Sequence, residues 1–145
     1  MPINGFNKTT LLDYPGKIAS TIFLGGCNFR CPFCQNSSLV LSPNKQPVIS
    51  TEEVLSVLKK RQGILEGVCI TGGEPTSDKE LFLLIDKIKE LGYPVKLDTN
   101  GSHPWILKKL VNNQMIDMVA MDIKSSKESY TKVSGCKNID LTSIC

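Results

Sequence analysis

Short apolar runs alternate along the chain with segments whose apolar residues recur at helical spacing. Four of these runs are rich in β-branched and other apolar residues and are predicted to be strands. They are Ile18–Leu24, Gly67–Thr71, Pro94–Thr99 and Asp117–Ile123. Between them we expect three helices, which begin after Ser50, at residue 78 and at Pro104. This repeated order of strand and helix predicts an α/β fold of four βα units, with a parallel sheet and right-handed connections.

Local signals mark where the predicted helices begin and end. Ser50 is a typical helix N-cap, and Glu53, three residues later, completes a capping box. Across residues 78–91 the apolar side chains recur with helical periodicity, and Gly92 provides a C-terminal stop. A further short helix is expected over Ser126–Val133.

Polar and glycine-rich segments stand at the end of each predicted strand. They are Cys27–Cys34, Gly72–Pro75, Asp98–Gly101 and the pair Asp122 and Lys124. In parallel α/β sheets, ligands bind at the carboxyl ends of the strands, which share one edge. We therefore expect these four segments to converge on a single site.

Composition and charge narrow the class of protein. A chain of 145 residues is long enough for one domain with one hydrophobic core. The net charge of +3 is too small to indicate nucleic-acid binding, and no apolar run approaches the roughly 20 residues of a membrane helix. The N-terminus lacks the features of a secretory signal, so we expect a cytoplasmic protein. Six cysteines in such a chain indicate metal-binding or catalytic thiols more than disulfides.

The cysteines after the first predicted strand have the spacing C-x3-C-x2-C. Cys27, Cys31 and Cys34 place three thiolates in one tight loop, which suits a soft metal or an iron–sulfur cluster. A four-iron cluster with three protein ligands leaves one iron open to a small molecule that carries an amino and a carboxylate group. A structural zinc site would need a fourth ligand, and the candidates His103 and Cys69 lie on other segments. Three inert, packed cysteines are a further alternative.

Two motifs together resemble the signature of the radical S-adenosylmethionine superfamily. One is the cysteine motif with an aromatic residue, Phe33, before its last cysteine, and the other is Gly72-Gly73-Glu74-Pro75. The resemblance implies a partial (βα) barrel in which Cys27, Cys31 and Cys34 hold a 4Fe-4S cluster and the open iron binds S-adenosylmethionine. It also implies a set of residues that bind this cofactor: Phe33, Gly72, Gly73, Glu74, Pro75, Asp98, Thr99 and Lys124.

Finer matches resemble the activases of glycyl-radical enzymes. They are Leu12–Gly16, Gly26–Asn36, Asp98–Gly101 and Asp122–Lys124. The most similar type is the anaerobic ribonucleoside-triphosphate reductase activating protein, and pyruvate formate-lyase activating enzyme is a near relative. The resemblance implies that one electron cleaves S-adenosylmethionine to a 5′-deoxyadenosyl radical, which abstracts a hydrogen atom from a glycine of the partner. The partner would be an anaerobic ribonucleotide reductase or a pyruvate formate-lyase-like enzyme, and the electron donor a flavodoxin or ferredoxin type protein.

The charged residues of these segments have roles under the same resemblance. Glu74 would balance the ammonium group of the cofactor, and Lys124 would pair with its carboxylate. A monovalent cation beside the cofactor would be bound by Asp98, Thr99, Asp122 and the carbonyl group of Ala120. As simpler alternatives, the two aspartates are ordinary acidic residues at strand ends and Lys124 is a solvated lysine.

Other conspicuous residues have plainer interpretations. Cys69 is predicted to be a small core residue and His103 a surface residue after a turn. Cys136 and Cys145 lack the C-x2-C spacing that would indicate a second cluster. Asp13–Gly16 either shapes a groove for the substrate or forms a plain turn.

The number of βα units is the main departure from the superfamily, whose partial barrel has more than the four predicted here. We therefore expect residues 1–145 to be the N-terminal part of a radical S-adenosylmethionine core domain, truncated at its C-terminus. Gln35 stands where relatives often have histidine. Two other functions stay open: a radical enzyme that acts on a small molecule, for example of the deazapurine-forming type, and a non-catalytic cluster-binding fragment.

Overall fold

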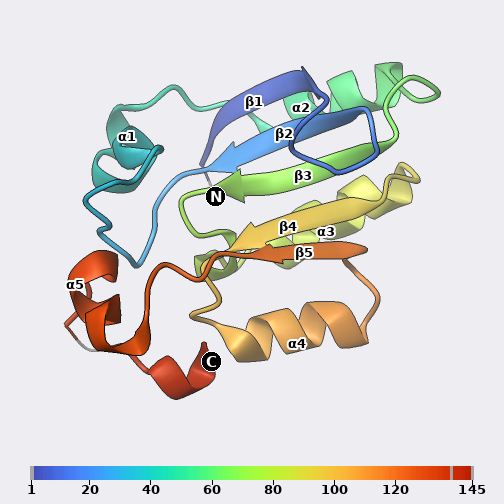
Figure 1. Ribbon diagram of the computed structural model, residues 1–145. Coiled ribbons are helices and arrows are strands. Elements are labelled where there is room, and N and C mark those ends of the chain that lie inside the picture. Colours follow the sequence, from blue (N-terminus) through green and yellow to red (C-terminus); the bar gives the residue numbers. More distant parts are fainter. Residues whose placement is uncertain (1, 138, 145) are drawn as a thin grey trace.

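The computed structural model describes residues 2–137 and 139–144. A five-stranded sheet lies at its centre, and the spatial order of the strands follows the chain. The strands are β1 (Ile3–Thr10), β2 (Ala19–Leu24), β3 (Gly67–Gly72), β4 (Val95–Thr99) and β5 (Met118–Met121). Strands β2 to β5 pair in parallel, and their carboxyl ends lie on the left in Figure 1. The fold is thus the predicted α/β partial barrel, whose sheet does not close within the described residues.

The edge strand β1, which the sequence did not predict, runs antiparallel to β2, whereas the four predicted strands are parallel as expected. Its sequence, INGFNKTT, lacks the run of apolar residues that marks the other strands. Ile3 is buried, whereas Asn7, Lys8 and Thr9 are exposed, and the register with β2 is irregular at two places. Backbone pairing with β2, rather than side-chain burial, therefore defines this strand.

Four helices follow the predicted order with shifted boundaries, and a short helix that was not predicted, α1 (Ser37–Leu41), precedes them. The four are α2 (Thr51–Lys60), α3 (Leu81–Glu90), α4 (Pro104–Asn112) and α5 (Tyr130–Ser134). The short 3-10 helices are η1 (Pro43–Lys45), η2 (Pro75–Ser77), η3 (Lys127–Ser129) and η4 (Leu141–Ser143). Helix α3 begins at Leu81 instead of residue 78, because η2 precedes it and the Asp78 carboxylate accepts a hydrogen bond from the Glu80 backbone N–H at 2.8 Å.

The main core lies between the sheet and helices α2, α3 and α4 (Figure 1). Neighbouring residues such as Ile70 and Leu97 face these helices and have no exposed surface. Because side chains alternate along a strand, Thr21, Cys69 and Lys96, which are aligned across β2, β3 and β4, lie on the opposite face. That face carries polar and ionisable side chains, and it ends at the carboxyl edge where the candidate site is found.

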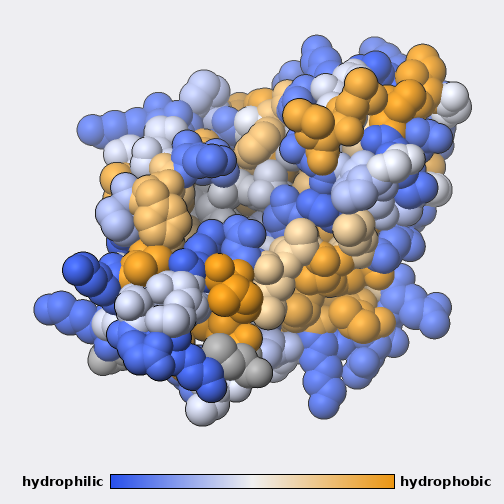
Figure 2. Space-filling model, viewed as in Figure 1, coloured by the Kyte–Doolittle hydropathy of each residue, from blue (hydrophilic) through white to orange (hydrophobic). Residues whose placement is uncertain are grey.

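The loop between β1 and β2 folds over part of this polar face. Tyr14 is 4% exposed, and the Asp13 carboxylate accepts a hydrogen bond of 2.5 Å from the Thr21 hydroxyl. Figure 2 shows apolar residues gathered over this loop at the upper right, where Leu11 and Leu12 are 71% and 88% exposed. Asp13–Gly16 is therefore a turn that packs on the sheet, and a role for it in substrate binding stays a prediction. No helix in the described ranges is long and apolar enough to cross a membrane.

The N-cap of α2 provides a test of the local structure. The Ser50 hydroxyl accepts a hydrogen bond of 3.1 Å from the Glu53 backbone N–H, as the capping-box pattern predicts. We expect Ser50→Ala to lower the free energy of unfolding by about 1 kcal/mol, because this N–H loses its partner. The control Ser56→Ala, at an exposed position inside the same helix, should change it by no more than about 0.5 kcal/mol. Urea unfolding of both variants measures the difference, and equal stabilities would contradict the capping role.

Candidate functional site

A cavity of about 380 Å³ opens at the carboxyl ends of the parallel strands. Its volume is in the range of small-molecule sites. All four segments that the sequence predicted to converge contribute to its lining. The predicted residues in the lining are Cys27, Cys31, Phe33, Cys34, Gly72, Gly73, Asp98, Thr99, Asp122 and Lys124. Glu74 and Pro75 are buried beside the cavity and do not line it.

The three cysteines are free thiols, each partly buried. The Cys27 sulfur accepts a hydrogen bond of 3.3 Å from the Phe29 backbone N–H and lies 3.9 Å from Nδ2 of Asn100. Hydrogen-bond donors to a ligating sulfur influence the reduction potential of an iron–sulfur cluster, because they stabilise negative charge on that sulfur. Burial raises the pKa of the Cys27 and Cys31 thiols above their ordinary value. Loading with metal therefore releases protons from these two thiols.

The glycine pair after β3 brings this loop against the cysteine loop. The Gly73 backbone N–H donates to the Leu24 carbonyl at 2.8 Å, and the Glu74 N–H donates to the Gly26 carbonyl at 2.8 Å. Gly72 has a φ of +123°. A Cβ at Gly72 would overlap the backbone of Leu24, and a Cβ at Gly73 would overlap the backbone of Gly26. The resemblance implies that these glycines bind the cofactor. The structure gives a separate reason for them, the close contact between the two loops that line the cavity.

Glu74 joins the loops after β3 and β4 from beneath the cavity. It is 2% exposed. One carboxylate oxygen accepts hydrogen bonds from the Thr99 hydroxyl at 2.7 Å and from the hydroxyl and backbone N–H of Thr76, and the other accepts from the Asn100 N–H at 2.7 Å. With both oxygens engaged in this way, Glu74 holds Thr99 and Asn100 in place. A direct contact with a ligand ammonium stays a prediction.

The substitution Glu74→Gln tests whether these hydrogen bonds stabilise the two loops. An amide has one acceptor atom, so its NH2 group would face at least one of the donors that Glu74 now satisfies. We expect a loss of about 2 kcal/mol in the free energy of unfolding of the metal-free protein. Glu90→Gln, at an exposed position near the end of α3, should leave the stability unchanged. If the two variants unfold at the same urea concentration, the hydrogen bonds of Glu74 do not stabilise the loops after β3 and β4.

The two aspartates and Lys124 are engaged in ion pairs. Asp98 pairs with Lys96, which precedes it by two residues on the same face of β4. Lys124 Nζ lies 2.9 Å from the Asp122 carboxylate, and its backbone N–H donates to the Tyr130 hydroxyl at 3.3 Å. Asp122 is 69% exposed, so this second pair is accessible to solvent and weak. Lys124 can therefore exchange Asp122 for a ligand carboxylate at little cost.

Three asparagines that have no separate role in the sequence analysis connect the loops of the site, and two of them, Asn36 and Asn100, line the cavity. Asn36 donates through Nδ2 to the Gly72 carbonyl at 3.0 Å, and Asn100 donates to the Asn28 side-chain oxygen at 2.9 Å. These bonds connect the cysteine loop to the loops after β3 and β4. Each asparagine lies within or beside a motif that the sequence analysis had already singled out, so position along the chain was the available signal.

The C-terminal segment, which carried little sequence signal, packs against the cysteine loop. Phe29 meets the fully buried Tyr130 edge to face, with ring centroids 6.4 Å apart. The Arg30 backbone N–H donates to the Ser134 carbonyl at 2.7 Å, and the Cys136 thiol donates to the Asn28 carbonyl at 3.0 Å. The segment thus supports the loop from below the cysteines. Cys145 lies outside the described residues.

Two lesser predictions have different outcomes. Cys69 is fully buried, as expected, and its pKa is raised to about 12, chiefly by burial and then by Asp98. His103 was expected at the surface but is half-buried, with Nδ1 2.9 Å from the Thr76 hydroxyl. This contact places His103 against η2, which follows the glycine loop.

These residues fit an iron–sulfur cluster better than a single metal ion. Within residues 2–137 and 139–144, no three His, Cys, Asp or Glu side chains are arranged to hold one ion. Three thiols that face a shared cavity suit a cluster, since each can bind a different iron. The fold and the site thus define an α/β protein with three thiols grouped at the carboxyl edge of its sheet, in an arrangement that suits an iron–sulfur cluster.

Comparison with known sequences identifies the family. The sequence model described as Radical SAM superfamily matches residues 21–142. The chain therefore belongs to the radical SAM superfamily, whose cofactors are a 4Fe-4S cluster and S-adenosylmethionine. This membership confirms the resemblance that the cysteine and glycine motifs indicated.

Individual relatives give a finer comparison. The chain is 35% identical over 136 residues to a Methanocaldococcus jannaschii protein provisionally named glycyl-radical enzyme activating enzyme MJ1227, a match that covers 93% of this chain and 55% of that one. A second protein of that organism with the same kind of name, MJ1632, is 29% identical over 91% of this chain and 46% of its own length. The chain thus spans about half the length of these relatives.

Two further matches widen the picture. The 7-carboxy-7-deazaguanine synthase of Aquifex aeolicus is 37% identical over 82 residues, which cover 56% of this chain and 35% of that enzyme. A solved structure of TYW1 with a lysine-pyruvate adduct has a TM-score of 0.58 and 20% identity, and the match covers 87% of this chain and 49% of that one. This structural likeness supports the fold.

Proposed function

We propose that the protein is an oxidoreductase that activates a glycyl-radical enzyme. The observation that carries this proposal is the similarity to MJ1227 over 93% of the chain, combined with the cavity that brings the three thiols to the glycine loop. The matches at Leu12–Gly16 and Asp98–Gly101 point the same way. On this resemblance, the partner would be an anaerobic ribonucleotide reductase or a pyruvate formate-lyase-like enzyme, and a flavodoxin or ferredoxin type protein would supply the electron.

The chemistry would come from the cofactors, and the chain would hold and orient them. The cluster would supply one electron to S-adenosylmethionine, and cleavage of this cofactor to methionine would provide the radical that takes a hydrogen atom from a glycine. Cys27, Cys31 and Cys34 would hold three of the four irons. The methionine amino group would meet the glycine loop, and its carboxylate would meet Lys124.

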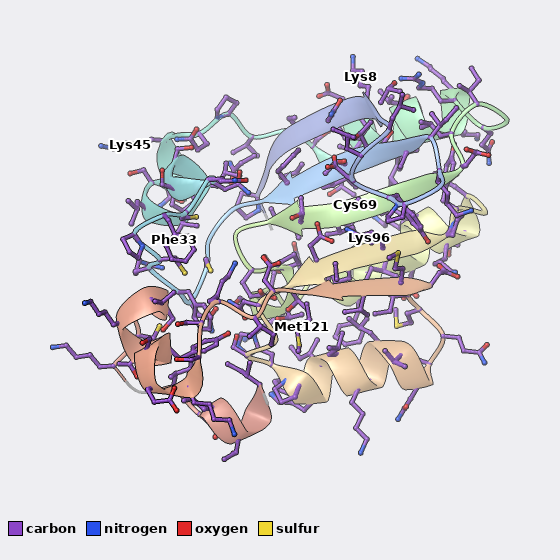
Figure 3. All side chains as sticks on the ribbon, in the orientation of Figure 1. Lys8, Phe33, Lys45, Cys69, Lys96 and Met121 are labelled. Atoms are coloured by element: carbon purple, nitrogen blue, oxygen red, sulfur yellow. The ribbon has the colours of Figure 1, made fainter. Side chains whose placement is uncertain are left out.

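The remaining walls would keep this geometry fixed and shield it. Asn36 and Glu74 hold the glycine loop and the loop after β4 in place through the hydrogen bonds described above. Phe33 is 57% exposed where the cysteine loop meets solvent (Figure 3), so it can cover a bound cofactor and become buried. Such covering would keep water away from the radical.

The test is radical transfer to a protein. The reconstituted chain, reduced in the presence of S-adenosylmethionine and an anaerobic ribonucleotide reductase, should produce the doublet signal of a glycyl radical in electron paramagnetic resonance. The Cys31→Ala variant should give no doublet. Formation of 5′-deoxyadenosine without a doublet on this reductase or on pyruvate formate-lyase would contradict the activase proposal.

A second candidate is a radical enzyme that acts on a small molecule. The match to 7-carboxy-7-deazaguanine synthase favours it over 56% of the chain. In that case, product formation would depend on a small-molecule substrate and no protein radical would appear. The third alternative, a non-catalytic fragment, predicts a cluster-loaded chain that forms no 5′-deoxyadenosine under reduction.

A further inference from the structure

The residues expected to bind a monovalent cation already have partners within the protein. Asp98 is paired with Lys96, and Asp122 lies 2.9 Å from Lys124. The Thr99 hydroxyl donates to Glu74 at 2.7 Å and accepts from the Gly101 N–H at 3.2 Å. Asp122 is exposed and can exchange its partner, whereas Asp98 and Thr99 are engaged inside the protein. The donor set therefore does not fit a free cation as long as Lys96 occupies Asp98.

Lys96 is the unexpected member of this group. Its side chain is 8% exposed, on the polar face of β4, with Nζ 3.7 Å from the Cys69 sulfur. Figure 3 shows Cys69 and Lys96 side by side on neighbouring strands. Burial of an ammonium group requires a partner of opposite charge, and the Asp98 carboxylate provides it through the ion pair with Lys96.

Lys96 contacts Asp98 from the side of the carboxylate that faces away from the cavity. Asp98 lines the cavity and is 31% exposed, whereas Lys96 does not line it. The Cys69 thiol donates to the other Asp98 oxygen at 3.5 Å. Lys96 and Cys69 thus approach the carboxylate from the sheet, and the cavity is left on its far side.

We propose that Lys96 is a built-in counter-cation for Asp98, which takes the place of a bound sodium or potassium ion beside the cofactor. The proposal rests on the assignment of the cavity as the S-adenosylmethionine site. Lys96 acts as a positioning residue: it neutralises Asp98 and fixes its orientation. A half-buried carboxylate without this partner would recruit a cation from solution or take up a proton.

The first experiment uses the protein without its cluster, so it is independent of catalysis. Sodium-23 relaxation reports cation binding directly, and thermal unfolding in potassium chloride against tetramethylammonium chloride reports its effect on stability. The wild type should show no specific sodium binding and the same Tm in both salts. Lys96→Met, which keeps the length of the side chain without its charge, should bind sodium and gain about 4 °C in potassium chloride.

Matched variants separate this role from a general loss of a lysine. Lys89→Met removes another lysine that is paired with an aspartate, Asp117, at 2.8 Å and outside the cavity, and it should behave as the wild type does. Lys96→Arg restores the charge and should again be independent of the cation. Specific sodium binding by the wild type, or a Lys96→Met variant that folds and binds none, would overturn the proposal. If Lys96→Met does not fold, the wild-type and Lys96→Arg measurements still decide.

The loaded protein provides a second measurement. The rate of 5′-deoxyadenosine formation by the wild type should be the same in both salts, while that of Lys96→Met should rise about tenfold in potassium chloride. A wild-type rate that depends on potassium would overturn the role of Lys96. Absence of any product would count against the proposed function alone, because the cluster-free measurements would still test Lys96.

Discussion

Replacement of any one of Cys27, Cys31 and Cys34 by alanine should reduce the iron content of the reconstituted protein from about four atoms per chain to less than about one. The three thiols line one cavity. In the described ranges, no set of three or more His, Cys, Asp or Glu side chains forms a site for a single metal ion that could replace them. Loss of one ligand would leave two, which is too few to retain a cubane. Iron analysis and the visible absorption of the anaerobically reconstituted variants measure this effect.

Cys136→Ser is the matched control for this experiment. Cys136 lies beside the same loop and its thiol contacts the Asn28 carbonyl, but it does not line the cavity. A serine hydroxyl can keep this hydrogen bond, so the iron content should stay at about four. Full iron retention by a Cys31→Ala variant, or loss of iron in Cys136→Ser alone, would contradict the assignment of ligands.

Replacement of Gly73 by alanine should cost about 3 kcal/mol or more in stability and should also weaken the cluster site. An added Cβ would overlap the Gly26 carbonyl, the same group that accepts the Glu74 N–H at 2.8 Å. Because Gly26 directly precedes Cys27, relief of the overlap requires the cysteine loop to move. Urea unfolding of the metal-free protein measures the first effect, and the rate of iron loss to a chelator measures the second.

Gly63→Ala is the matched control. Gly63 has a φ of +84° but no atoms within 4 Å of an added Cβ, so it should lose about 1 kcal/mol from backbone strain alone. Its iron should be lost no faster than that of the wild type, because the residue lies in the turn after α2. Equal effects of the two substitutions would mean that the contact between the loops does not support the cluster site.

Much of the sheet follows from simple sequence patterns. The apolar runs at 67–71 and 94–99 form strands β3 and β4. Strands of a parallel sheet that is covered by helices are rich in apolar residues, so these runs are a clear signal. The cysteine loop and the glycine loop were placed correctly relative to these strands, since ligand-binding segments follow strand ends in parallel sheets. Pattern and topology together were therefore enough to predict the cavity.

Other features could not be predicted because they depend on distant contacts. Strand β1 has an irregular sequence and is held by backbone pairing to β2. The short helix expected over Ser126–Val133 is present as η3 and α5, but its packing could not be predicted, because Tyr130 is buried by Phe29, a partner about 100 residues away in the sequence. Neither contact leaves a periodic signal in its own segment.

Lys96 is a polar residue whose environment follows in part from its position in the sequence. A lysine within the apolar run 94–99 is unusual, because burial of an ammonium requires a partner. Asp98, two residues later on the same strand, lies on the same face and is that partner. The alternation of side chains along a strand is enough to infer that Lys96 and Asp98 share a face. The contact between Lys96 and Cys69 depends on the register between β3 and β4, which the sequence does not specify.

The most direct test of the account is the electron paramagnetic resonance spectrum of the reduced cluster with and without S-adenosylmethionine. If the three cysteines leave one iron open inside this cavity, addition of S-adenosylmethionine should change the g-values of the reduced cluster, because the amino and carboxylate groups become ligands of that iron. Lys124→Ala should weaken this response. A reduced cluster whose spectrum is unaffected by saturating S-adenosylmethionine would contradict the account.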